Sequence, residues 1–110
     1  MPSRTPIPVQ RALRQLGDNL VAARKLQRLT AAQVGERAGV GRMTVGRLER
    51  GEAGVSLEIT LRVARALRLM EPMVRASDPY GTDVGRLRAD EVLPTRVGRP
   101  RRPPERDDTP

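Results

Sequence analysis

The sequence predicts an all-α fold, in which five helices form one small domain and the end of the chain forms a largely disordered tail. Apolar residues recur at spacings of three and four positions between residues 9 and 76, which is the period of amphipathic helices. Glycines and helix-capping residues separate these stretches. Residues 94–110 contain five prolines and five arginines, a composition that cannot bury enough apolar surface to order itself. We therefore expect an N-terminal arm (1–8), the helical domain (9–76), a docking or linker segment (77–93) and the tail.

The first helix is predicted to begin near Pro8 and to run for about twenty residues. Its apolar stripe consists of Val9, Leu13, Leu16, Leu20 and Ala23. A second helix follows from Ala31 to Ala38. The hydroxyl of Thr30 can cap this helix while Gln33 reaches back, so we expect a capping box.

A glycine turn separates the second helix from the third. Gly39 can adopt the left-handed conformation without steric cost, so the chain can reverse there. The third helix is predicted from Arg42 to Arg50, and Gly51 and Gly54 break the following turn. Two short helices joined by a glycine turn, with an arginine-rich second member, are typical of a helix-turn-helix DNA reader.

Two further helices complete the predicted domain. Ser56 caps a fourth helix that ends near Leu69. Its inward-facing residues are expected to be Leu57, Thr60, Leu61, Ala64 and Leu67. Pro72 suits the first turn of a short fifth helix, roughly Glu71 to Arg75, which Ser77-Asp78-Pro79 stops.

The composition excludes several classes of site. The chain has no cysteine and no histidine, which removes disulfides, the usual zinc sites and mechanisms that need an imidazole base. We therefore expect no enzyme activity, no metal and no cofactor. Tyr80 is the single aromatic residue, so a platform for stacking unpaired bases is absent and duplex DNA is favoured over single strands.

The positive charge is concentrated in the helical part. Residues 9–75 carry 13 basic and 6 acidic side chains, a net of +7 out of +8 for the chain, whereas residues 76–110 carry 7 of each. Such a domain suits phosphates, with binding that weakens as salt rises. The alternative is a solvated arginine-rich surface without a partner.

No apolar run approaches the roughly 20 residues of a membrane span. The polar start Met1-Pro2-Ser3-Arg4 has no apolar signal segment behind it. We therefore expect a cytoplasmic or nucleoid-associated protein that does not contact a membrane.

The stretch from Leu16 to Leu69 resembles the Cro/phage-repressor (Xre) family of helix-turn-helix proteins. The resemblance is carried by Leu16-Gly17-Asp18-Asn19-Leu20, Arg24, Leu29-Thr30, Ala38-Gly39-Val40, Val45, Leu48, Glu49-Arg50-Gly51 and Ser56-Leu57-Glu58. It implies a five-helix domain whose third helix enters the major groove of operator DNA. The sequence departs from the family at Ala31, where a glutamine commonly holds a phosphate.

This resemblance assigns roles to individual residues. The expected base-reading residues are Arg42, Met43, Thr44 and Arg47. The expected contacts to the DNA backbone are Thr30, Gly41, Gly46 and Arg50. The alternative is that the two base-reading arginines contact only phosphate or solvent.

Arg24 and Glu49 match family positions that form a structural ion pair between the first and third helices. The alternative is that each side chain is solvated separately.

Such readers usually bind as two-fold dimers, so a homodimer is expected. Candidate interface residues are Leu69, Met70, Met73 and Val74, unless the methionines only complete the core.

Residues 78–87 and 93–97 weakly resemble the tails of HipB-type antitoxins that accompany HipA-like kinases. This likeness implies a brief helix over Thr82 to Val92 that docks onto a toxin or onto the second protomer; the alternative is a linker. Within the tail, Gly98-Arg99-Pro100-Arg101-Arg102 resembles an AT-hook, and the alternative is a non-specific attraction to phosphate.

The favoured function is thus a repressor that acts as the antitoxin of a toxin–antitoxin pair and regulates its own operon. A free-standing regulator is the alternative, and an enzyme or structural adaptor is disfavoured by the missing histidine, cysteine and paired carboxylates.

Overall fold

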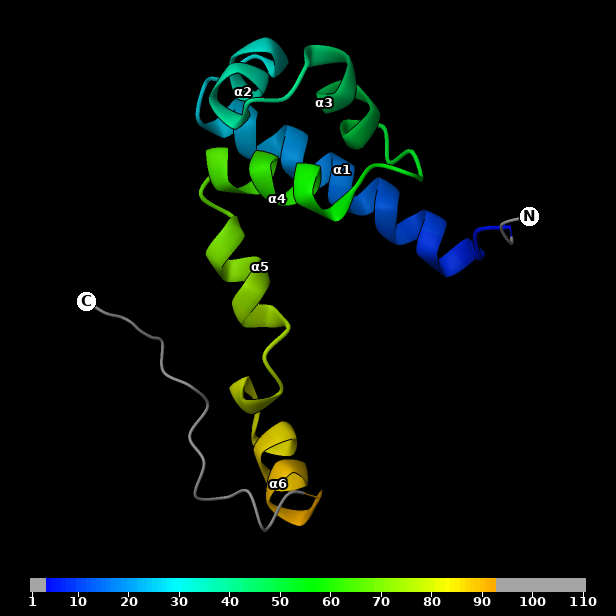
Figure 1. Cartoon of the computed structure of the whole chain (residues 1–110), viewed down its shortest axis with the longest axis vertical. Coiled ribbons are helices and arrows are strands. Elements are labelled where there is room, and N and C mark those ends of the chain that lie inside the picture. Colours follow the sequence, from blue (N-terminus) through cyan, green and yellow to red (C-terminus); the bar gives the residue numbers. More distant parts are fainter. Residues whose placement is uncertain (1–3, 93–110) are drawn as a thin grey trace. The chain divides into compact units, whose positions relative to one another are not determined.

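A computed structural model describes residues 4–92, which form six α-helices and one 3-10 helix and contain no strand (Figure 1). The elements are α1 (Ile7–Leu26), α2 (Ala31–Ala38), α3 (Arg42–Glu49), α4 (Leu57–Ala66), α5 (Met70–Ala76), η1 (Pro79–Gly81) and α6 (Asp83–Val92). The all-α prediction is confirmed. The chain divides into two compact units between Met73 and Val74, within α5. Among the described residues, no helix has the length and apolar character needed to cross a membrane.

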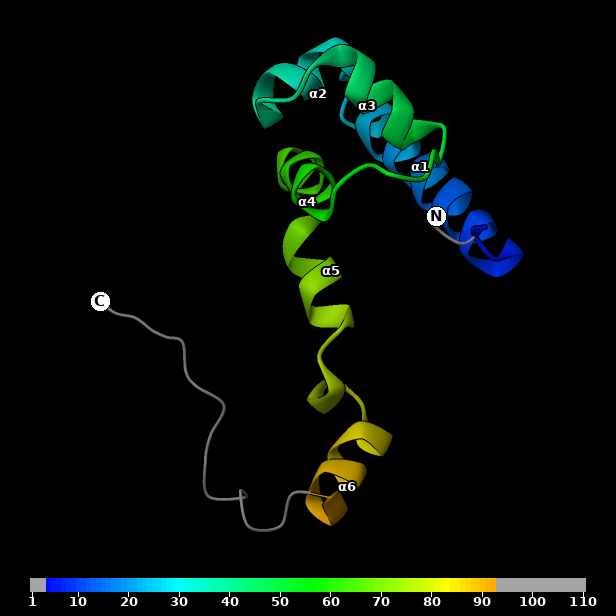
Figure 2. The ribbon, with the colours of Figure 1, turned by 45° about the vertical axis from the view of Figure 1, so that its right-hand side comes forward.

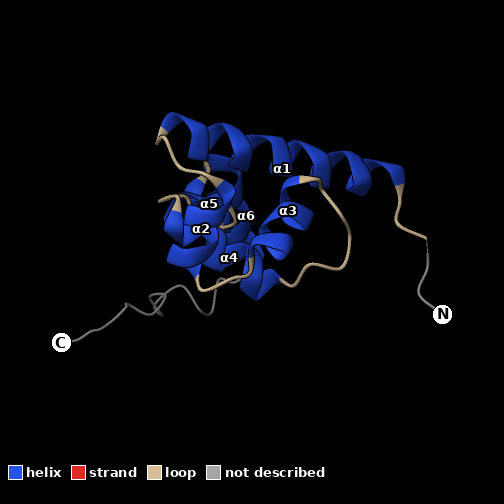
Figure 3. Ribbon diagram, turned by 90° about the horizontal axis from the view of Figure 1, so that it is seen from above, coloured by secondary structure: helices blue, strands red, loops and turns tan. Residues whose placement is uncertain are grey.

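In the first unit, α3 packs against the long helix α1 and against α2, and α4 packs against α2 (Figure 3). The core of this unit joins all four helices and consists of Leu20, Leu29, Val34, Ala38, Val45, Leu48, Val63 and Leu67. Fully burying an aliphatic side chain of this size contributes about 1.5–3 kcal/mol. The core therefore forms the scaffold behind α3.

The local sequence signals predicted the first three helices correctly. The α1 and α2 bounds agree with the prediction, and α3 ends at Glu49 with Arg50 as its cap. The capping box is present: the backbone N–H of Gln33 donates to Thr30 Oγ1 at 3.1 Å, and the Thr30 N–H donates to Gln33 Oε1 at 2.8 Å.

The fourth helix begins as predicted, with Ser56 Oγ accepting a hydrogen bond from the Ile59 N–H at 3.1 Å, but it differs from the prediction in its C-terminal end and in one core residue. It stops at Ala66 rather than near Leu69, because Arg68 adopts a positive φ of 63° and turns the chain. Leu57, the first residue of α4, is 71% exposed and not part of the core, since it lines an open groove beside Arg37 and Ala38 of α2. Val63 occupies the core instead, at 1% exposure.

All four helices of the first unit end with the same backbone geometry. A residue with a positive φ ends each helix: Gly39 is the C-cap of α2, and Arg28, Gly51 and Arg68 directly follow the C-caps of α1, α3 and α4. In α1, the N–H of Leu29 donates to Arg24 O at 2.8 Å and that of Arg28 to Lys25 O at 3.0 Å. This pair of bonds defines a Schellman motif. Two of the four motifs therefore place an arginine where glycine is usual.

A glycine lets α1 and α3 approach closely. Gly17 in α1 is buried, and a Cβ atom on it would lie 2.9 Å from the carbonyl oxygen of Leu48. A larger residue would push α3 away from α1. The two helices lie side by side in both ribbon views (Figures 1 and 2).

The second unit contains η1 and α6, which pack against each other. Asp78 accepts a hydrogen bond from the Tyr80 N–H at 2.9 Å, and Thr82 Oγ1 accepts from the Gly85 N–H at 2.9 Å. Arg86 donates to Tyr80 O at 2.8 Å. The sequence allowed either a helix or a linker over Thr82 to Val92, and the structure has a helix there, α6. Predicted disorder over 94–110 and the AT-hook-like segment lie outside the described residues.

The arginine at the end of α1 generates a stability prediction. Arg28→Gly should raise the free energy of unfolding by about 0.5–1 kcal/mol, because it removes the steric cost of a Cβ atom at φ 60°, partly offset by glycine's larger unfolded-state entropy. Thermal unfolding measures the change. Arg11→Gly, at an exposed position inside α1, is the control and should cost about 1 kcal/mol. Equal destabilisation by both substitutions would contradict the strain assigned to Arg28.

Candidate DNA-binding surface

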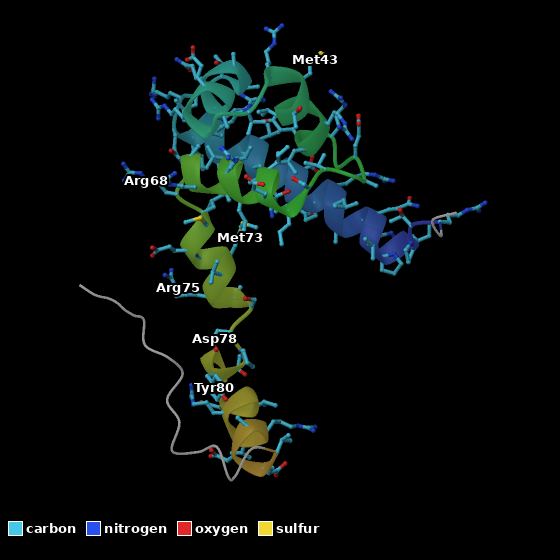
Figure 4. The ribbon with its side chains drawn as sticks, in the orientation of Figure 1. Met43, Arg68, Met73, Arg75, Asp78 and Tyr80 are labelled. Atoms are coloured by element: carbon cyan, nitrogen blue, oxygen red, sulfur yellow. The ribbon has the colours of Figure 1, made fainter. Side chains whose placement is uncertain are left out.

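Helix α3 has one buried face and one exposed face. Val45 and Leu48 point into the core and hold the helix. On the other face, Arg42 is exposed and Met43 is 80% exposed, with its side chain directed away from the domain (Figure 4). The remaining predicted base-reading residues, Thr44 and Arg47, are partly exposed. We call Arg42, Met43, Thr44, Gly46, Arg47 and Arg50 the α3 surface.

The N-terminus of α3 has no side-chain cap. Gly41 is the N-cap residue, is exposed, and has open space where a Cβ atom would be. The first N–H groups of a helix lack intrahelical partners and attract anions. Gly41 therefore leaves these donors accessible to a phosphate, whereas the hydroxyl of Thr30 already accepts a hydrogen bond within the α2 capping box.

Glu52, which is not among the predicted site residues, binds two arginines of the α3 surface. Arg47 Nε donates to Glu52 Oε1 at 3.1 Å, and Arg50 Nε donates to Glu52 Oε2 at 2.8 Å. The hydrogen bonds from Arg50 and then from Arg47 lower the pKa of the Glu52 carboxyl below its ordinary value. The Arg50 guanidinium also covers Gly46, where a Cβ atom would lie 3.1 Å from Arg50 Nη1.

A sequence signal for this contact existed. Gly51 follows the C-cap of α3, and the Glu52 N–H donates to Arg47 O at 3.0 Å in the resulting Schellman motif. That motif brings the second residue after the C-cap beside the residue that accepts its N–H. The glycine therefore pairs positions 47 and 52, although their separation is longer than the helical spacing of three or four.

Arg24 and Glu49 form the ion pair that ties α3 to α1. Arg24 Nε lies 2.7 Å from Glu49 Oε2, and Arg24 Nη2 donates to Glu49 Oε1 at 3.2 Å. Arg24 Nη1 also donates to Leu29 O at 3.2 Å. The side chains are only 17% and 12% exposed, and the hydrogen bonds to Glu49 raise the pKa of Arg24 against the opposing effect of burial.

The α3 surface lies outside the groove that the first unit contains. That groove has a volume of about 720 Å³, and apolar residues such as Leu57, Leu61 and Met70 line it together with Arg37, Arg62 and Arg65. No residue of the α3 surface lines it. Over residues 4–92, no three acidic, histidine or cysteine side chains gather as a metal site would require. The candidate site is thus an exposed helix face that suits binding to a large partner.

Comparison with known protein families identifies a domain that contains the candidate site. The family described as a helix-turn-helix domain matches residues 15–77, more than half of the chain. This range contains the whole α3 surface and the ion pair behind it. Neither the curated proteins nor the solved structures give a match.

The ion pair generates a second prediction. Glu49→Ala should lower the free energy of unfolding by about 2–3 kcal/mol, because it leaves the largely buried charge of Arg24 without its partner. Urea unfolding at neutral pH measures this loss as a lower midpoint with an unchanged slope.

Glu58→Ala is the matched control. Glu58 forms an exposed ion pair with Arg62 at 3.0 Å, and its removal should cost less than about 1 kcal/mol. The double variant Arg24→Met with Glu49→Leu should recover most of the stability. Similar small losses for Glu49→Ala and Glu58→Ala would show that Arg24 is solvated independently.

Proposed function

Because the chain belongs to the helix-turn-helix domain family, we propose that it is a transcriptional repressor that reads operator DNA through the α3 surface. The observation that supports the proposal most directly is that α3 has one buried face and one exposed face. Val45 and Leu48 fix the helix from behind, while Arg42 and Met43 project outward at its N-terminal end. Side chains at that end of a recognition helix are those that meet base edges in the major groove.

The chemistry of these side chains fits base reading. An arginine such as Arg42 can donate two hydrogen bonds to guanine O6 and N7, which discriminates against other bases by roughly 1–3 kcal/mol. Met43 offers an apolar surface suited to a thymine methyl group. Met43 is 80% exposed, so its side chain is accessible for this contact.

Phosphate contacts would set the register of α3 on the duplex. The uncapped N–H groups after Gly41 and the guanidinium of Arg50 are suitable donors. The net charge of +7 over residues 9–75 adds non-specific attraction. The Arg24–Glu49 pair holds α3 at a fixed angle to α1 while these contacts form.

We further propose that the protein binds as a homodimer. One recognition helix covers only a few base pairs, and two-fold pairing places two of them on half-sites one helical turn apart. Met70 and Met73 are half-buried and Val74 is exposed, so α5 retains apolar surface for a second protomer. Leu69 packs against the core and is better explained as part of it.

The biological setting we propose is that of an antitoxin, with a HipA-like kinase toxin as the partner and a cytoplasmic, nucleoid-associated location. Helix α6 supports partner docking because Val84, Leu87 and Val92 are each more than half exposed. A free-standing Xre-family regulator is the second candidate, favoured by the basic first unit alone. In both cases we propose a non-catalytic protein.

A mobility-shift titration tests DNA reading. The duplex spans the region upstream of the protein's own reading frame, and a shift below micromolar protein at moderate salt is expected. Arg42→Ala should bind that duplex about 10–100-fold more weakly and lose its preference over random DNA. Arg50→Ala should weaken both duplexes alike and flatten the salt dependence by about one unit. No shift, or equal losses for both variants on both duplexes, would count against base reading by Arg42.

The neighbouring reading frame tests the antitoxin role. A kinase-like gene beside this one should arrest growth when expressed alone, and co-expression of this chain should restore growth. A variant with Val84→Asp and Leu87→Asp should bind operator DNA normally and fail to restore growth, since these side chains lie on α6 and not on α3. The absence of such a gene would favour the free-standing regulator.

A further inference from the structure

We propose that Glu52 is a specificity-determining residue, which competes with DNA phosphate for Arg47 and Arg50 and orients Arg47 for base contact. This inference rests on the proposed DNA-reading function and assigns to that surface an acidic residue that opposes binding. One carboxylate contacts both arginines, at 3.1 Å from Arg47 Nε and 2.8 Å from Arg50 Nε. A negatively charged residue therefore stands among the groups that would meet the DNA.

The position of Glu52 is fixed by the backbone. Its N–H donates to Arg47 O at 3.0 Å, and the Gly51 N–H donates to Leu48 O at 3.0 Å. Gly51 adopts φ 73°, and a Cβ atom on it would lie 2.7 Å from the Cα atom of Arg14 in α1. The turn that carries Glu52 is thus seated against α1, so the carboxylate is held beside α3.

This geometry has two consequences for DNA binding. A phosphate that contacts Arg50 must displace the Glu52 carboxylate and tolerate its charge, which weakens binding to DNA of any sequence. The hydrogen bond from Arg47 Nε to Glu52 restricts the orientation of the Arg47 guanidinium. A side chain that is already restricted loses less conformational entropy when it binds a matching base. Glu52 should therefore lower affinity for random DNA more than affinity for the operator.

The experiment compares the full chain with Glu52→Gln and Glu52→Asp. The probes are a duplex of random sequence and a duplex selected from a random library by the unaltered protein. Glu58→Gln is the matched control, because Glu58 loses the same charge from an exposed ion pair, with Arg62 at 3.0 Å, on α4 rather than beside α3.

Glu52→Gln should bind the random duplex roughly tenfold more tightly at 0.1 M salt, and its affinity should fall more steeply as salt rises, because the surface that meets the phosphates then carries one more net positive charge. The ratio of selected to random affinity should fall. Glu52→Asp should lie near the unaltered protein, since it keeps the charge, and Glu58→Gln should change neither slope nor ratio.

A measurement without DNA separates orientation from charge. The Nε–H resonances of Arg47 and Arg50 should exchange with solvent more slowly in the unaltered protein than in Glu52→Gln, and Glu52→Asp should restore part of the protection. Equal exchange rates in all variants would overturn the orienting role of Glu52.

The outcomes distinguish the two proposals. If the unaltered protein binds duplex DNA and Glu52→Gln shows the same affinity, slope and ratio, the inference about Glu52 is wrong while DNA reading stands. If neither protein binds any duplex at low salt, the proposed function fails, and the inference fails with it.

Discussion

The partly buried ion pair between Arg24 and Glu49 is the interaction on which the proposed binding surface depends. It joins α1 to the last residue of α3, and Arg24 also binds the carbonyl of Leu29 just before α2. One guanidinium thus connects three segments of the first unit. Because Gly17 allows the backbones of α1 and α3 to come close beside this pair, both the distance and the angle of α3 are determined there. A charge pair can fix such an arrangement because an unpaired partner would be costly.

Helices α1 to α4 end in the same Schellman motif, but the side chain that the motif positions differs in chemistry from one helix to the next. Each Schellman motif brings the second residue after the cap beside the last turn of its helix. After α1 and α4 that residue is Leu29 or Leu69, which packs into or against the core. After α3 it is Glu52, and the contact becomes an ion pair with Arg47. Val40, which the same motif positions after α2, also packs against the core. The same backbone geometry therefore serves packing at three helix ends and electrostatics at the surface that would face DNA.

The distribution of charge suggests a balance between affinity and selectivity. The first unit carries most of the positive charge of the chain, and Arg42, Arg47 and Arg50 concentrate it on α3. Phosphate attraction alone would favour every sequence equally. An acidic residue among these arginines would weaken the attraction to phosphate, which is the same for every DNA sequence. Base contacts would then contribute a larger fraction of the binding free energy.

The sequence by itself determined the all-α class, the bounds of α1 and α2 and the capping box at Thr30, because spacing, caps and glycines act within a few residues. Only the tertiary structure decided that Val63 is buried instead of Leu57 and that α4 ends at Ala66. Which of the two side chains is buried depends on which neighbouring helices cover each side of α4. The end of α4 depends on Arg68, which adopts the left-handed conformation although its residue type does not indicate this. The pairing of Glu52 with Arg47 and Arg50 also required the folded chain, since it arises only where the turn after α3 rests against α1.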